Sequence, residues 1–186
     1  TWTFTFTIKH TTPPDEIGIP VLKESLVECL SDISEPEILP VVEDVCGIRL
    51  APTLDSPVIT YNMNGCEGEV YYSYSYEDCA GLQFLWTYTY TVEYQDFDMP
   101  ENVTEVVACA SDIYTPDLPE VYDNCGTLIT AITGPVVSAL PDCEGEVDYV
   151  WTFTDCAGNT NSWTYTFIIE YQDFDMPENV TEVVAC

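Results

Sequence analysis

Bulky side chains and small polar side chains alternate along two neighbouring segments near the end of the chain, at 147–153 and 163–169. A period of two is typical of strands that bury one face, and the turn-forming DCAGN between the segments predicts a long β-hairpin. Two segments of the first half, at 70–76 and 86–92, show the same alternation. The large residues of the four segments are Val70, Tyr72, Tyr74, Tyr76, Trp86, Tyr88, Tyr90 and Val92, then Val147, Tyr149, Trp151, Phe153, Trp163, Tyr165, Phe167 and Ile169.

Shorter β-rich pieces, separated by prolines and glycines, precede the second hairpin. They lie at 103–108, 119–123, 127–133 and 135–140. A helical period is visible only at 21–30. So many short strands predict an all-β fold of tandem repeats, each an immunoglobulin-like β-sandwich. The strict alternation assigns Trp86, Trp151 and Trp163 to the core rather than to a flat carbohydrate-binding surface.

The whole pattern repeats along the chain. The sequence EYQDFDMPENVTEVVAC stands at 93–109 and again at 170–186, and Cys66 and Trp86 recur 77 residues later as Cys143 and Trp163. TWTFTFTI at the start matches the last strand of each repeat, so we expect a window from a longer tandem array. The expected domains are the last strand of a preceding repeat at 1–12, complete repeats at 13–93 and 94–170, and the first strand of a following repeat at 171–186.

The charge of the chain excludes several classes of partner. Thirty-three acidic residues against three basic ones give a formal net charge of −30. Such a chain repels the phosphates of nucleic acids and an anionic membrane surface. Hydrophobic residues nevertheless make up 46% of the sequence, so it can form cores, and no apolar run is long enough for membrane insertion of this segment.

Nine cysteines divide into two sets of four and one more. They are Cys29, Cys46, Cys66 and Cys79, then Cys109, Cys125, Cys143 and Cys156, and last Cys186. Structural zinc sites use close pairs such as C-x-x-C, which are absent from the sequence, and the sole histidine, His10, lies outside both sets. We therefore expect disulfides, two in each repeat, and an oxidising extracellular or cell-surface location.

The order of VxAC, DNCG, CEGxVxY, DCAGN and WTYTF resembles the four-cysteine HYR-like repeats of very large surface adhesins in gliding Bacteroidetes, the SprB type. This resemblance covers nearly the whole chain. It implies an immunoglobulin-like module that recurs many times in a cell-surface or filamentous protein exported by a type IX system. The first repeat departs from the pattern at Val45, which replaces the Asn of DNC, and at Leu82, which replaces the Asn of CAGN.

We expect no enzyme, because a single histidine in a terminal segment cannot form a Ser-His-Asp or Cys-His arrangement. The leading hypothesis is a structural stalk or filament that holds an adhesive tip away from the cell, in surface attachment or gliding motility. One alternative is a ligand-binding adhesin module that recognises polysaccharide or a partner protein. Another is a subunit of a strand-exchanged extracellular polymer. The expected partners are neighbouring repeats of the same chain, other filament subunits or surface polysaccharide, and not nucleic acid.

Calcium is the candidate cofactor. In a tandem array the last strand of a repeat starts at its N-terminal end, so the DCAGN turn, QDFDMPEN and YDNC are expected to meet there. Oxygen ligands from several segments are what a Ca²⁺ site requires. The predicted ligands are Asp96, Asp98, Glu101, Asp123, Asn124, Asp155 and Asn159. The alternative is that every end of so acidic a repeat is acidic without binding a metal.

Four cysteines permit three pairings, and the strand directions choose among them. Cys143 and Cys156 flank one strand and lie too far apart for a disulfide, which excludes this pair together with Cys109–Cys125. The first strand brings Cys109 to the end where Cys143 begins the hairpin, and the returning strand brings Cys125 to the end that holds Cys156. The predicted bonds are Cys109–Cys143, Cys125–Cys156, Cys29–Cys66 and Cys46–Cys79, with Cys186 pairing to a cysteine beyond residue 186.

Overall fold

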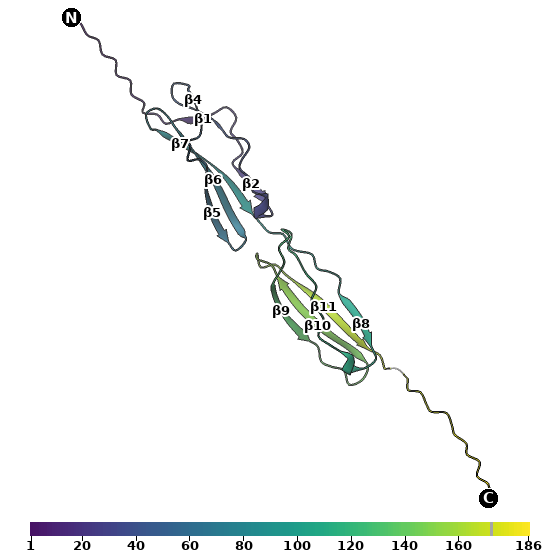
Figure 1. Ribbon diagram of the computed structural model, residues 1–186. Coiled ribbons are helices and arrows are strands. Elements are labelled where there is room, and N and C mark those ends of the chain that lie inside the picture. Colours follow the sequence, from purple (N-terminus) through teal and green to yellow (C-terminus); the bar gives the residue numbers. More distant parts are fainter. Residues whose placement is uncertain (172) are drawn as a thin grey trace. The chain divides into compact units, whose positions relative to one another are not determined.

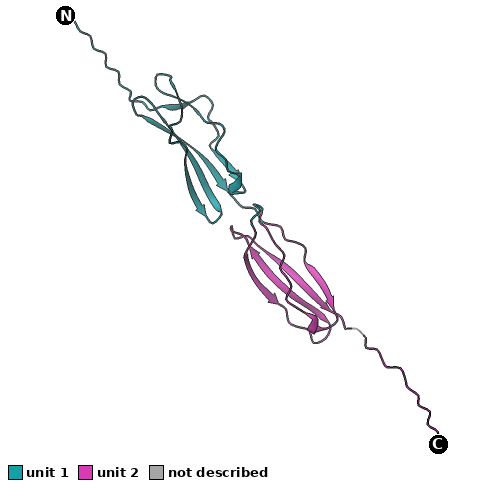
Figure 2. Ribbon diagram, viewed as in Figure 1, with its two compact units in different colours: residues 1–96, 124–127 teal, residues 97–123, 128–186 magenta. Residues whose placement is uncertain are grey.

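Strands form nearly all the regular structure of the computed structural model, which describes residues 1–171 and 173–186 (Figure 1). Two compact units divide the chain (Figure 2). Unit 1 comprises residues 1–96 and 124–127, and unit 2 comprises residues 97–123 and 128–186. The sequence pattern does not predict that residues 124–127 join unit 1 while the segments on either side belong to unit 2. The predicted all-β fold with sandwich-like sheets is confirmed.

The main sheet of unit 1 has the strand order β2-β7-β6-β5. Its strands are β2 (Glu24–Val27), β5 (Val58–Asn64), β6 (Glu67–Glu77) and β7 (Gln83–Val92). The predicted hairpin is β6 and β7, which pair antiparallel along their whole length, and β2 runs parallel to β7. A small sheet of β1 (Asp15–Ile17), β3 (Val41–Glu43) and β4 (Arg49–Leu50) completes the unit, with a 3-10 turn at Leu30–Asp32.

The core of unit 1 lies between these two sheets. Val42 of the small sheet is fully buried in one cluster with Tyr74 and Trp86 of the main sheet. Alternate residues of β6 and β7 point into this cluster, as their period of two predicts. Full burial of each such side chain contributes about 1.5–3 kcal/mol relative to exposure, so the aromatic stripe is the main source of stability.

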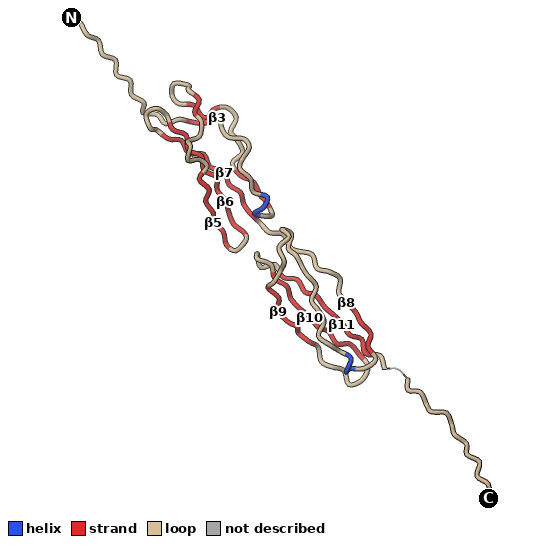
Figure 3. The backbone as a smooth tube through the Cα atoms, in the orientation of Figure 1, coloured by secondary structure: helices blue, strands red, loops and turns tan. Residues whose placement is uncertain are grey.

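Unit 2 repeats the main sheet in the order β8-β11-β10-β9. Its strands are β8 (Val103–Val107), β9 (Ala131–Val137), β10 (Gly145–Thr154) and β11 (Thr160–Ile169), with a 3-10 turn at Ala110–Asp112. β10 and β11 form the predicted second hairpin (Figure 3). β8 runs parallel to β11. Trp151 and Trp163 are 3% exposed, so their assignment to the core is confirmed. Phe97 and Val121, which lie outside the strands, belong to the same buried cluster as both rings.

Several local expectations differ from the structure. The helical period at 21–30 forms β2 instead, because pairing with β7 satisfies its backbone in an extended conformation. The predicted strand at 119–123 is reduced to a single bridge at Tyr122, and the pieces at 127–133 and 135–140 supply β9. No strand is assigned at 1–12 or among the described residues of 171–186, and the expectation that these segments belong to neighbouring repeats stays a prediction. Residue 172 lies outside the described residues.

Candidate functional site

The strand register of unit 1 brings its cysteines to two opposite ends of the main sheet. At one end Val92 pairs with both Val27 and Gly68, so β2 and β7 finish where β6 begins. Cys29 follows β2 and Cys66 precedes β6, which places both at this end. The turn between β6 and β7, with Cys79, lies at the other end.

Cys46 and Cys79 meet at the turn end of unit 1, around the ring of His10. The Sγ of Cys46 lies 3.4 Å from His10 Nε2, and the Sγ of Cys79 lies 3.9 Å from His10 Nδ1. His10 Nδ1 is also 3.5 Å from the Oδ2 of Asp78, whose carboxylate is buried. Burial acts to raise the pKa of Asp78, but hydrogen bonds from the backbone of Leu82 and Ala80, together with His10, outweigh it and lower that pKa.

Unit 2 repeats this arrangement at the ends of its own sheet. Ile169 pairs with Val107 and with Gly145, so β8 and β11 finish where β10 begins. Cys109 and Cys143 therefore lie at this end, as the sequence predicts. Cys156 lies in the β10–β11 turn at the opposite end.

The predicted bonds between the cysteines are wrong, although these end positions are right. Cys29 bonds to Cys125, with a Cα–Cα distance of 5.6 Å and 96 residues between them in the sequence. Cys66 and Cys156 are also disulfide-bonded. None of the four predicted bonds forms. Cys29 bonds to Cys125 across the repeat boundary, which excludes Cys29–Cys66 and Cys125–Cys156. The cysteines of the other two predicted bonds, Cys46–Cys79 and Cys109–Cys143, are free, exposed thiols.

The predicted pairings were wrong because an even number of cysteines in each repeat is compatible both with bonds within a repeat and with bonds between repeats. Two cysteines at each end of a sheet fit either arrangement. Residues 124–127 join unit 1, which brings Cys125 to Cys29. The Sγ of Cys125 also lies 3.6 Å from the carbonyl oxygen of Glu28. Among the residues described, Cys186 is a free, exposed cysteine too.

The predicted calcium ligands include groups that the turns already use. Asp155 accepts hydrogen bonds from the backbone N–H groups of Ala157 and Asn159 on Oδ1, and from the side-chain amide of Asn159 on Oδ2. The side chain of Asn124 donates to the main-chain oxygen of Asp96 at 2.9 Å. Asp96 and Asn124 belong to unit 1, whereas the candidates at 98, 101, 123, 155 and 159 belong to unit 2.

A metal site is not assembled in the described structure. Within residues 1–171 and 173–186, no group of three or more His, Cys, Asp or Glu side chains is placed to hold an ion. Calcium binding therefore stays a prediction. Across the same residues, no helix combines the length and apolar character needed to cross a membrane.

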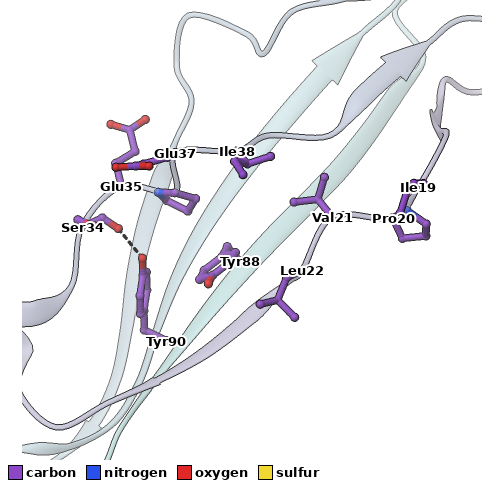
Figure 4. Close-up of a pocket in the computed structure, with 11 residues that line it drawn as sticks. Ile19, Pro20, Val21, Leu22, Ser34, Glu35, Glu37, Ile38, Tyr88 and Tyr90 are labelled. Atoms are coloured by element: carbon purple, nitrogen blue, oxygen red, sulfur yellow. Dashed lines mark hydrogen bonds between the residues drawn. The ribbon is translucent and has the colours of Figure 1, made fainter.

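An apolar groove that the sequence did not predict lies beside β7 in unit 1 (Figure 4). Its volume is about 500 Å³, and Tyr88 and Tyr90 form its floor. Ile19, Leu22 and Ile38 project from two loops along its edges and are 90%, 68% and 70% exposed. Exposed apolar side chains gathered around a hollow are typical of binding surfaces.

One residue that lines the groove is small where unit 2 has an aromatic residue. Counted from Cys29 and Cys109, Ser34 corresponds to Tyr114. The hydroxyl of Tyr90 donates to the main-chain oxygen of Ser34 at 2.9 Å, and the short serine side chain leaves the space above open. Aligning the two repeats from Cys29 and Cys109 would have shown this replacement of tyrosine by serine before the structure was known.

In unit 2 the corresponding place is filled by a ring. Tyr114 packs edge-on against Phe167, with 5.2 Å between ring centroids. The hydroxyls of Tyr114 and Tyr165 both donate to Glu105, at 2.8 and 2.6 Å. These hydrogen bonds lower the pKa of Glu105, and the bond to Glu105 is the main cause that raises the pKa of Tyr165.

Comparison with known protein families gives two matches. The family described as "HYR-like domain with 4 cysteines" matches residues 17–92 and again residues 97–169. These ranges contain the two hairpins and both sets of four cysteines. A comparison with curated proteins finds no match. Because the family matches cover most of the sequence, the chain belongs to the HYR-like domains with four cysteines and contains two of them in tandem.

Proposed function

We propose that this chain is a non-enzymatic structural repeat region of a very large extracellular adhesin or cell-surface filament. HYR-like four-cysteine repeats are adhesion-type extracellular modules, and the disulfides fit a secreted or surface protein. The observation that carries the proposal is the Cys29–Cys125 bond. It joins a cysteine of the first family match, 17–92, to one of the second, 97–169.

A bond of this kind changes how a pulled chain carries load. Only residues 93–96 connect the two matched ranges along the backbone. Cys29–Cys125 provides a second covalent connection, so most of the first repeat lies inside a closed loop. Tension applied along the chain can then pass through the disulfide without extending that loop. A stalk that holds a tip against shear needs this resistance to unravelling.

The biological setting follows from the resemblance to SprB-type repeats. We place the chain in a gliding or surface-attachment protein of a bacterium that exports it by a type IX system. Neighbouring repeats, other filament subunits and surface polysaccharide are the partners in this setting. The high negative charge supports a solvated surface structure and disfavours nucleic acid.

Single-molecule force spectroscopy of the chain, held at both ends, tests the structural role. In the oxidised protein the residues between Cys29 and Cys125 cannot extend, whereas reduction releases up to 96 residues, or about 320 Å of contour length. A variant with serine at all four bonded positions, Cys29, Cys66, Cys125 and Cys156, serves as the control and should behave like the reduced chain at this step. Equal contour lengths in the oxidised and reduced wild type would contradict the load-bearing role.

The groove of unit 1 favours a second function, the recognition of an apolar or aromatic ligand or of the flat face of a sugar. Its tyrosine floor offers stacking, and Glu35 and Glu37 offer acceptors at its edge. Ser34→Tyr should abolish binding because it introduces the ring that fills this place in unit 2. Ser31→Tyr adds the same ring at an exposed position outside the lining and is the matched control. Glycan-array binding that survives Ser34→Tyr would exclude the groove.

A further inference from the structure

The bonded and free cysteines occupy complementary positions in the two repeats. We number the four positions of each repeat in chain order. The first repeat has disulfides at its first and third positions, Cys29 and Cys66. The second repeat has them at its second and fourth positions, Cys125 and Cys156. The free thiols fill the opposite places, which are the second and fourth of the first repeat and the first and third of the second: Cys46, Cys79, Cys109 and Cys143.

The free first position of the second repeat has the same local structure as the bonded first position of the first repeat. Cys29 has backbone angles φ −128° and ψ 148°, and Cys109 has φ −142° and ψ 150°. Each of the two donates its backbone N–H to an aspartate three residues later, Asp32 or Asp112, at 3.2 Å. The backbone at Cys109 is therefore already shaped as at a disulfide-bonded cysteine.

The fourth positions match as closely. In the turn around bonded Cys156, Asp155 accepts backbone N–H groups two and four residues ahead on Oδ1, at 2.9 and 2.8 Å. In the turn around free Cys79, Asp78 does the same at 2.8 and 2.9 Å. The same Asx turn thus holds an oxidised cysteine in one repeat and a free one in the other.

Exposure differs between the bonded and the free cysteines at the first and third positions. Cys29 and Cys66 are 6% and 8% exposed, whereas their counterparts Cys109 and Cys143 are exposed thiols. The free cysteines also lie in pairs at single ends of their units, since Cys46 and Cys79 contact one histidine ring and Cys109 and Cys143 flank the same strand ends. Each of these two ends therefore presents two neighbouring free thiols that can form disulfides.

We propose that these two ends are docking sites for further four-cysteine repeats, each held by two disulfides. Cys109 bonds to the second-position cysteine of the next repeat, as Cys29 bonds to Cys125, and Cys143 bonds to its fourth-position cysteine. At the other end, Cys46 and Cys79 receive the first- and third-position cysteines of a preceding repeat. This proposal rests on the proposed structural function and extends it, because every junction of the array is then covalently closed.

Each bond forms by two thiol–disulfide exchanges with oxidised glutathione as the oxidant. The thiolate of Cys109 attacks one glutathione sulfur, which forms a mixed disulfide and releases one reduced glutathione. The thiolate of the partner cysteine then attacks the Cys109 sulfur and displaces the second glutathione. Two protein thiols and one glutathione disulfide thus become one protein disulfide and two reduced glutathiones.

Two half-blocked variants test the proposal, with a second copy of this chain as the partner repeat. Both carry Cys186→Ser, which removes the remaining free thiol. Variant A, Cys46→Ser/Cys79→Ser, keeps only the Cys109 end, and variant B, Cys109→Ser/Cys143→Ser, keeps only the Cys46 end. Circular dichroism and peptide mapping of Cys29–Cys125 first confirm that each variant is folded.

We expect oxidised glutathione to leave A alone and B alone monomeric on a non-reducing gel. An equimolar mixture should give dimers and nothing larger, whereas the chain that carries only Cys186→Ser should give a ladder. Peptide mapping of the dimer should recover Cys109 linked to Cys46 and Cys143 linked to Cys79.

Three outcomes would overturn the docking sites: no dimer in the mixture, dimers of A or B alone, or a bond within one copy between Cys46 and Cys79. The force measurement on a single chain is independent of this result. The docking proposal can therefore fail while the structural function stands, and the structural function can fail while the docking proposal stands.

Discussion

The Cys29–Cys125 disulfide should contribute more to the stability of unit 1 than any single side chain, and its removal gives the sharpest test. The bond closes a loop with a sequence separation of 96 residues. The chain-entropy relation for a loop of this length gives about 4.7 kcal/mol at 25 °C, through fewer conformations of the unfolded chain. The variant Cys29→Ser/Cys125→Ser removes both sulfurs, so no unpaired thiol is left in the buried place of Cys29.

Urea unfolding measures the effect. At a slope of about 2 kcal/mol per molar, the loss of this bond lowers the midpoint of unit 1 by about 2 M. Hydrogen exchange of peptides from β6 and β7 assigns the transition to unit 1, because both strands lie in that unit. The free, exposed thiols are alkylated beforehand, which prevents thiol–disulfide exchange and disulfide bonds between copies.

Cys109→Ser is the matched control, since Cys109 has the same backbone and the same aspartate contact as Cys29 but closes no loop. We expect its free energy of unfolding to stay within about 0.5 kcal/mol of the wild type, as for an exposed substitution. A double variant that unfolds at the midpoint of Cys109→Ser would refute the loop-closure reasoning.

Three further changes test other parts of the structure. Gly68→Ala should destabilise unit 1 by about 2 kcal/mol or more, because its Cβ would lie 2.3 Å from the carbonyl oxygen of Asn62. The control Gly18→Ala has a positive φ but open space around its Cβ, and should destabilise the unit by about 1 kcal/mol. Equal losses of unfolding free energy in urea would contradict the clash. Asp78 has a lowered pKa, so its stabilisation is complete above the ordinary pKa of about 3.9 and is lost as the pH falls through the lower folded value. Asp78→Asn should therefore flatten the melting temperature below about pH 4, and an unchanged acid slope would exclude this role. If calcium binds the folded chain, EDTA should lower the melting temperature of the wild type but not of Asp96→Asn/Asp98→Asn, whereas equal melting in EDTA and calcium would rule the site out.

The sequence by itself determined the hairpins and the ends at which the cysteines lie. The alternation along β6, β7, β10 and β11 left one possible buried face, because a slip of one residue would expose every aromatic ring. Strand direction then determined that Cys109 and Cys143 share one end of unit 2. What the pattern did not contain was the partner of each thiol, since a bond within a repeat and a bond to the next repeat use the same positions.

Tertiary structure alone decided what the repeated segment EYQDFDMPENVTEVVAC forms. In its first copy Val103–Val107 is strand β8, and Phe97 and Val107 are 3% and 8% exposed. In its second copy the identical residues Phe174 and Val184 are 82% and 80% exposed, and no strand forms among residues 173–186. The physical reason is that a strand needs a neighbour for its backbone hydrogen bonds and a core for its side chains, which β11 and the core clusters of unit 2 supply only to the first copy.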